Sequence, residues 1–336
     1  MRPPGSILLV GLAACAGRPS PVPAQPGTPS ASVAASVPVL PSGEVGAEPS
    51  RGPHRATLKF ELNGRKFPLP LVHATVAGEP VWLIVDTGAN SHVIAGWVAK
   101  RAGLAMRPLG DVGSDHAGRA VTAFTVEHPN VMVDEWGPLA DGPMLVTDVP
   151  DPIARTGIGG FVSPQMLAAA DEGVVLDMPA HEMRTTPWDD GVREVQEHAG
   201  RDVAPGGVRL CEDTSSSIRG LLYVLSASVD GHGVELLLDT GAHRTDVFTT
   251  SRAGRLLGGR ARPSKELVYA ASGLVRTSLV RATDVKIGDW SLTADIDLVP
   301  GVADPMCPRD GAASMDALGS CLLLLGRKEL QGRCGP

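Results

Sequence analysis

The sequence has few aromatic residues, no cluster of basic residues and no long hydrophobic run. Its 336 residues include 5 Phe, 2 Tyr and 5 Trp, and the formal net charge is −7. Because no run of Lys or Arg occurs, the chain has no basic face of the kind that nucleic acids require. Its longest apolar stretch is shorter than the roughly 20 residues of a membrane-spanning helix. These absences predict a globular protein that neither binds nucleic acid nor crosses a membrane.

The amino terminus has the features of an export signal. A short positive region at residues 1–2 precedes an apolar stretch at 7–13, and the motif Leu-Ala-Ala-Cys ends at Cys15. This motif resembles the lipobox of bacterial lipoproteins, which implies cleavage before Cys15 and acylation of its thiol. The resemblance predicts an extracytoplasmic protein, lipid-anchored to a bacterial envelope membrane, and Ala16 favours the outer membrane. The alternative is an ordinary secretory signal with an incidental cysteine.

Cysteine and histidine spacings do not indicate a metal site. Neither Cys-x-x-Cys nor His-x-x-x-His occurs, so we expect no metal. In an oxidising compartment the four cysteines after Cys15 can form up to two disulfides in any of three pairings. We favour a bond between Cys307 and Cys321. The other two cysteines are Cys211 and Cys334.

Composition divides the chain into five segments. Residues 1–15 form the signal peptide and lipobox, and residues 16–55 are rich in Pro, Ala and Ser without a period, which predicts a disordered stalk. Two stretches, 56–180 and 219–336, combine short Val- and Leu-rich segments with many of the 40 Gly and 29 Pro residues. Such punctuation is typical of strands joined by turns, so we predict an all-β lobe in each. The polar segment 181–218 is expected to connect the two lobes.

An internal repeat relates the two predicted lobes. Residues 78–89 align without a gap on residues 231–242, and both segments are hydrophobic before they end in Asp-Thr-Gly-Ala. An apolar-Gly element follows in each half at a similar distance, at Ile158-Gly159 and at Leu318-Gly319. A single Asp-Thr-Gly is a common turn sequence. Two copies in the same context indicate that the chain contains two copies of the same fold.

This pattern resembles the half-site of pepsin-like and retropepsin-like aspartic proteases. The resemblance implies an all-β protein with two similar closed-barrel lobes, a central cleft and a glycine-rich flap hairpin in each lobe. The flap tips are expected at Gly118 and Gly273. Pepsin-like enzymes have a tyrosine in the first flap, whereas here Tyr269 stands beside the second, so the pattern is closer to two fused retropepsins. Because one chain contains both half-sites, a monomer is sufficient.

The resemblance also predicts a catalytic pair formed by Asp86 and Asp239. Two adjacent buried carboxylates do not both ionise easily, so they share a proton. The ionised member can activate a water molecule while the protonated member stabilises the developing oxyanion, so no cofactor is needed. The sequence does not distinguish the acid from the base, and we expect an acidic pH optimum. The supporting turn residues are Thr87, Gly88 and Ala89 in the first half, and Thr240, Gly241 and Ala242 in the second.

These residue types suit the two turns. Glycine lets the chain turn sharply and bring its N–H groups close to a carboxylate. The family resemblance implies that the hydroxyls of Thr87 and Thr240 hydrogen-bond between the lobes. The predicted activity is therefore that of an aspartic endopeptidase acting on an extended peptide or protein substrate. Two alternatives are a catalytically silent lipoprotein of the same fold that binds peptides or envelope partners, and an unrelated β-domain in which both Asp turns are structural.

Overall fold

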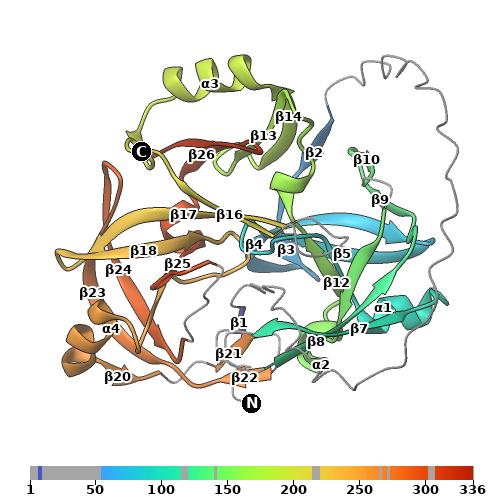
Figure 1. Ribbon diagram of the computed structural model, residues 1–336, viewed down its shortest axis with the longest axis horizontal. Coiled ribbons are helices and arrows are strands. Elements are labelled where there is room, and N and C mark those ends of the chain that lie inside the picture. The colour runs from blue at the N-terminus through green and yellow to red at the C-terminus, as the bar shows by residue number, and fades with distance from the viewer. Residues whose placement is uncertain are drawn as a thin grey trace, which may run out of the picture.

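The computed structural model describes residues 7–9, 54–114, 120–139, 142–213, 220–264, 267–270, 273–301 and 307–335. Strands predominate over short helices, and they form two lobes and a third sheet that lies beside both (Figure 1). The first lobe lies on the right of Figure 1, the second on the left, and the third sheet at the top. The predicted all-β class with two lobes is confirmed.

The first lobe is a ten-stranded sheet with the order β10-β9-β4-β5-β12-β6-β11-β8-β7, and β3 pairs with β4 off this path. Its strands are β3 (Lys59–Leu62), β4 (Arg65–Val76), β5 (Glu79–Val85), β6 (Val93–Ala95), β7 (Arg107–Ser114), β8 (Ala120–Val126), β9 (Val131–Val133), β10 (Gly137–Pro138), β11 (Met144–Thr147) and β12 (Ile158–Val162). The lobe also contains α1 (Gly96–Arg101), α2 (Asp151–Ala154) and the 3₁₀ turn η1 (Pro164–Met166).

The second lobe is an eight-stranded sheet with the order β16-β17-β18-β25-β19-β24-β23-β20. Its strands are β16 (Arg209–Asp213), β17 (Gly220–Val229), β18 (His232–Leu238), β19 (Asp246–Phe248), β20 (Arg262–Pro263), β23 (Ser278–Ile287), β24 (Trp290–Val299) and β25 (Gly311–Ala313). Its helices are α4 (Arg252–Leu257), η2 (Gly258–Arg260) and α5 (Met315–Leu318). The hairpin of β21 (Leu267–Ala270) and β22 (Gly273–Val275) extends from this lobe.

The two lobes are closed barrels with the same topology. In the second lobe β17 pairs with β18 on one side and with β23 on the other, which closes the sheet. In the first lobe β4 pairs with β5 and β9, and β9 continues the chain from β8. Strand β23 of the second lobe therefore corresponds to β8 and β9 together. Its first part pairs with β24 as β8 pairs with β11, and its last part pairs with β17 as β9 pairs with β4. The internal repeat predicted this arrangement.

A third, six-stranded sheet was not predicted from the sequence. Its order is β15-β27-β26-β13-β14-β2, and the helix α3 (Trp188–Glu197) packs against it. Part of the segment expected to connect the lobes, residues 181–213, forms β14, α3, β15 and β16, so this connection is folded. The strands are β2 (Arg55–Thr57), β13 (Glu172–Asp177), β14 (Glu182–Pro187), β15 (Arg201–Asp202), β26 (Cys321–Leu325) and β27 (Leu330–Cys334).

The favoured disulfide was wrong. The structure pairs Cys211 with Cys307 and Cys321 with Cys334. Cys321 and Cys334 are directly opposite each other in the antiparallel pair β26–β27, so strand register brings their sulfurs together. Cys211 lies in β16, and its bond to Cys307 ties this edge strand to the segment before β25. The sequence could not distinguish the pairings, because one bond depends on the register of the β26–β27 pair and the other joins residues that are 96 positions apart.

One of the two apolar-Gly elements was also misassigned. Ile158-Gly159 lies in β12 as expected, but Leu318-Gly319 lies at the end of α5. The strand that corresponds to β12 is β25, because β12 pairs in parallel with β5 as β25 does with β18. Gly160 and Gly311 occupy matching places, since a Cβ on either would overlap a backbone carbonyl oxygen of the neighbouring strand β6 or β19. The true second element, Gly-Ala-Ala, is less apolar and was therefore overlooked.

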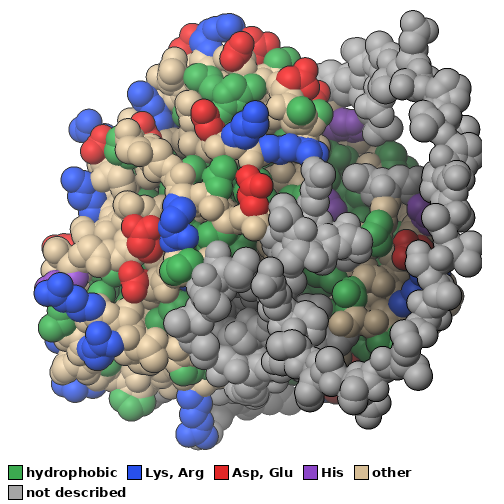
Figure 2. Space-filling model, in the orientation of Figure 1, with side chains coloured by type: hydrophobic (Ala, Val, Ile, Leu, Met, Phe, Trp, Pro, Cys, Tyr) green, Lys and Arg blue, Asp and Glu red, His purple; other side chains and the backbone are tan. Residues whose placement is uncertain are grey.

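The amino-terminal region is described only at β1 (Ile7–Leu9), which pairs in parallel with β21. The predicted stalk and Cys15 lie outside the described residues. In the part of the chain that the structure describes, no helix has the length and apolar character that a bilayer crossing requires. On the face shown in Figure 2, acidic and basic side chains are interspersed over the second lobe.

Candidate active site

Two equivalent strands deliver Asp86 and Asp239 to the centre of the molecule. Asp86 follows β5, and its N–H donates a hydrogen bond of 2.8 Å to the carbonyl of Val162 in β12. Asp239 follows β18, and its N–H donates a bond of 3.0 Å to the carbonyl of Ala313 in β25. Both side chains are fully buried. Apolar residues precede each Asp, so each strand is anchored in a barrel core and its end is rigid.

The two Asp-Thr-Gly turns enclose each other's carboxylates. A Cβ atom on Gly88 would lie 2.6 Å from Cγ of Asp239, and a Cβ on Gly241 would overlap the carboxyl group of Asp86. Each carboxylate therefore packs directly against the turn of the opposite lobe. Glycine is required at both positions because any larger residue would displace the partner lobe's carboxylate.

Each carboxylate has one oxygen held by its own turn. Oδ1 of Asp86 accepts hydrogen bonds from the N–H groups of Gly88 (2.8 Å) and Ala89 (3.1 Å). Oδ1 of Asp239 accepts one from Gly241 N–H (2.9 Å). The Oδ2 atoms of both residues are buried and have no hydrogen-bond partner among the described residues. The turns thus fix the orientation of both side chains and leave one oxygen of each for chemistry.

The threonines join the lobes through a symmetric set of hydrogen bonds. The Thr87 hydroxyl donates to the carbonyl of Leu238 (2.8 Å) and accepts from the N–H of Thr240 (3.0 Å). In the same way the Thr240 hydroxyl donates to the carbonyl of Val85 (2.7 Å) and accepts from the N–H of Thr87 (3.1 Å). All four residues, Thr87, Thr240, Leu238 and Val85, are buried. The bonds between lobes that the resemblance implied are present.

Replacing Thr87 by valine is expected to lower the free energy of unfolding by about 3 kcal/mol, because two buried backbone groups lose their partners. Thr87→Ser is the matched control: it keeps the hydroxyl and is expected to cost roughly 1 kcal/mol for the lost methyl group. Urea denaturation of the two variants measures the difference. Equal stability of the serine and valine variants would show that the hydroxyl does not hold the lobes together.

Burial raises the pKa of both carboxyl groups, and the charge of Asp239 adds to the rise at Asp86. The pKa of Asp86 is raised well above its usual value, first by burial and then by the neighbouring charge of Asp239. Burial raises the pKa of Asp239 to about 6, while a hydrogen bond with Asp86, the Gly241 N–H and the positive charge of Arg309 oppose the rise. The pair therefore retains a proton at mildly acidic pH.

The surroundings of the two aspartates differ, which the sequence analysis missed. Strand pairing places Asp246 and Asp297 of the second lobe where the first lobe has Val93 and Leu145. Likewise, Asp316 follows β25 where Gln165 follows β12. Asp86 thus has uncharged neighbours at the positions where the second lobe has carboxylates. A signal existed in the sequence, because the alignment of the two halves continues without a gap from 78–89 to Val93 and Asp246.

Gln165 holds the first turn, and Asp316 holds Thr245, which follows the second turn. The side-chain amide of Gln165 donates to the carbonyls of Thr87 (3.1 Å), Ala89 (3.0 Å) and Leu221 (2.8 Å), and so braces the first turn. Oδ1 of Asp316 accepts from the N–H (2.9 Å) and the hydroxyl (2.7 Å) of Thr245. Burial raises the pKa of Asp316 to about 6, although these hydrogen bonds oppose the rise.

The two predicted flaps are described only in part. Strands β7 and β8 form a hairpin in the first lobe, but its tip, with Gly118, lies outside the described residues. Strands β21 and β22 form the second hairpin, and Gly273 is the first residue of β22. Tyr269 lies in β21, whose outer edge pairs with β1.

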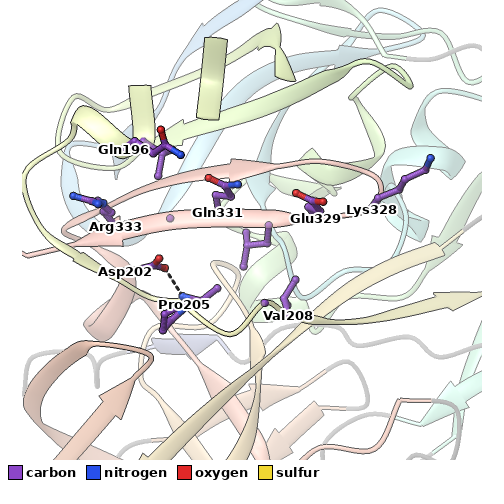
Figure 3. A pocket seen from close by; sticks show the side chains of 13 residues that line it. Gln196, Asp202, Pro205, Val208, Lys328, Glu329, Gln331 and Arg333 are labelled. Carbon is purple, nitrogen blue, oxygen red and sulfur yellow. Dashed lines mark hydrogen bonds between the residues drawn. The ribbon is translucent and has the colours of Figure 1, made fainter. Parts of the chain in front are cut away.

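A separate cavity lies on the third sheet (Figure 3). It has a volume of about 530 Å³, and its lining includes side chains from β27, from the segment after β15 and from the end of α3. None of the site residues predicted from the sequence lines it. Among the described ranges, no group of three His, Cys, Asp or Glu residues is arranged to hold a metal ion. The labelled lining residues are Gln196, Asp202, Pro205, Val208, Lys328, Glu329, Gln331 and Arg333.

Two closed barrels, each presenting one buried Asp-Thr-Gly turn to the other, define the aspartic protease class of fold. Comparison with known families agrees: the model of the aspartyl protease family matches residues 72–160 and 225–316, which together cover more than half of the chain. The chain therefore belongs to the aspartyl protease family. Each match contains one of the two aspartates. No curated protein matches the sequence.

Proposed function

We propose that this protein is an aspartic endopeptidase in which Asp86 and Asp239 form one catalytic pair. The observation that carries the proposal is the mutual enclosure of the two carboxylates, each fully buried against the glycine of the other turn. Family membership supports it. A protein that used these turns only for structure would gain nothing from two adjacent buried carboxylates, because their burial and repulsion destabilise the fold.

The asymmetric surroundings suggest which aspartate holds the proton. Burial and the charge of Asp239 hold the pKa of Asp86 well above its usual value, so Asp86 is the protonated member. Asp239 lies near Arg309, whose charge favours ionisation, so it is the base. Asp239 takes a proton from water, the water oxygen attacks the peptide carbonyl carbon, and Asp86 protonates the carbonyl oxygen. The tetrahedral diol then breaks its C–N bond, the nitrogen takes the proton from Asp239, and a diol hydroxyl returns one to Asp86.

The substrate that this site suits is an extended segment of peptide or protein. The alternative function is that of a silent family member that binds peptides without cleaving them. The intact Asp-Thr-Gly turns and the two Oδ2 atoms without partners among the described residues favour catalysis. A single chain contains both half-sites, so a monomer without a cofactor is sufficient for the proposed activity.

Incubation of the purified full-length chain with a diverse peptide library between pH 3 and 8 tests this function. Mass spectrometry of the products is expected to show internal cleavage, fastest at acidic to mildly acidic pH. Peptides that bind to the folded protein and are recovered intact at every pH would support the silent alternative.

We also propose that the protein is exported and held at a bacterial envelope membrane by acylation of Cys15, with the outer membrane favoured. The motif ending at Cys15 supports this proposal. The variant Cys15→Ala is expected to lose incorporation of labelled fatty acid. Labelling that persists in the variant would contradict the anchor.

A further inference from the structure

Asp246 lies on the wall of the second barrel that carries Asp239. In β19 it is directly opposite Asp297 of β24 and Ala312 of β25, and Ala312 is opposite Leu237 of β18. Residues opposite each other in a sheet place their side chains on the same face. This face is not the barrel interior. The next residue along each strand, Leu238 after Leu237 and Val247 after Asp246, points to the opposite face and packs in the main hydrophobic core. Asp239 comes two residues after Leu237 and so continues the same face.

The Asp246 carboxylate is fully buried and has no side-chain hydrogen-bond partner among the described residues. The backbone N–H of Ala312 is a donor that opposes the rise of its pKa. Its neighbour Asp297 differs: its oxygens accept from the hydroxyl of Thr277 (3.0 Å) and from Arg244 (3.2 Å). A buried ionisable group without a side-chain partner is costly for folding, and such groups concentrate at functional sites.

The fold does not require a carboxylate at this position. The equivalent residue of the first lobe is Val93, which is also buried and has the same strand neighbours. The barrel therefore forms equally well around a valine. Asp246 is an addition to one lobe only, and it lies beside only one member of the catalytic pair.

The charged groups around Asp246 come from three elements. Asp239 at the end of β18 and Asp297 on β24 repel its negative form, while Arg309, just before β25, attracts it. Burial is the main cause that raises the pKa of Asp246 well above its usual value, followed by the charge of Asp239. This coupling is reciprocal, because the interaction between two carboxylates acts equally on both.

We propose that Asp246 is a positioning residue for the catalytic pair, a third buried carboxyl group whose ionised form acts on Asp239 and extends peptide hydrolysis toward neutral pH. The inference rests on the proposed function. With Asp246 present, its negative form offsets the charge of Arg309, and the pair keeps its shared proton to a higher pH. Without it, Arg309 acts on Asp239 unopposed, and the pair loses that proton at a lower pH.

The pH dependence of kcat/KM tests the role of Asp246. In the full-length Asp246→Asn and Asp246→Val variants, the alkaline limb of the profile is expected to move down by about one pH unit. The acidic side is expected to stay within about twofold of wild type. Arg309→Gln is expected to move the limb in the opposite direction. Val93→Thr is the matched control in the first lobe and should leave the limb in place.

Three outcomes would overturn the inference. An unchanged alkaline limb in an active Asp246 variant would do so, as would an equal loss of activity at every pH. Failure of both variants to fold would give Asp246 a structural role instead. An absence of cleavage by the wild type would contradict the proposed function itself, and so remove the basis of this inference.

Thermal unfolding gives a second readout that needs no activity. A raised pKa in the folded protein means that ionisation of Asp246 destabilises the fold as the pH increases. The melting temperature of Asp246→Asn relative to wild type is therefore expected to increase between pH 4 and pH 7. A difference that is constant with pH would show that Asp246 does not hold a proton in this range, and would overturn the proposal.

Discussion

Replacing Asp86 or Asp239 by asparagine is expected to lower kcat/KM for peptide hydrolysis by about 10³-fold or more. Asparagine has nearly the same shape, so it preserves the packing against the opposite glycine, but it can neither accept the proton of water nor return one. Because the two residues act as one unit, the double variant should be little worse than either single variant. Steady-state kinetics on a peptide from the library measures the loss.

Asp289→Asn is the control for this comparison, since Asp289 is an exposed aspartate outside the two turns. It is expected to retain wild-type activity. Activity that survives in either Asp86→Asn or Asp239→Asn would show that the carboxylates do not form the catalytic pair. Losses that multiply in the double variant would instead mean that the two residues act independently.

The protein is expected to be more stable at pH 4.5 than at pH 7.5. Burial raises the pKa of Asp239 and of Asp316 to about 6, above the value near 4 of an unfolded aspartate. A raised pKa means that the folded state binds the proton more tightly, so this contribution is complete below about pH 4 and is lost as the pH rises through 6. Each group accounts for about 3 kcal/mol of that loss.

Urea denaturation at the two pH values measures this effect. The buried His92 acts in the opposite direction, because burial lowers its pKa to about 4, but it is one group against four carboxyl groups with raised pKa values, those of Asp86, Asp239, Asp246 and Asp316. The variant Asp316→Asn should lose part of the difference between the two pH values, because one of the carboxyl groups with a raised pKa no longer titrates. A free energy of unfolding that rises from pH 4.5 to pH 7.5 would contradict the raised pKa values.

Local sequence predicted the barrels and the catalytic pair because their signals are local. Each Asp-Thr-Gly-Ala follows a hydrophobic strand, and the gapless match of residues 78–89 to 231–242 transfers one lobe's topology to the other. The third sheet has no such signal. Its strands come from widely separated parts of the chain, and only tertiary packing brings residues 172–187 next to 321–334.

The internal repeat does not predict the residues in which the two half-sites differ. Leu318-Gly319 fits the expected pattern better than Gly311, although Gly311 occupies the position that packs against the backbone of β19. Asp246 was overlooked because a repeat directs attention to residues that match. The residues that do not match, Asp246 against Val93 and Asp316 against Gln165, are those that distinguish one carboxylate of the pair from the other.

The third sheet also constrains the order in which the molecule can be completed. Strand β13 follows the first lobe near the middle of the chain, whereas its partner β26 is among the last strands to be synthesised. Pairings between such distant segments have a high entropic cost and form late. The first barrel can collapse alone, but the sheet that joins the lobes cannot close before the final residues arrive. A site that needs both lobes is therefore completed only after the last strands of the third sheet have paired.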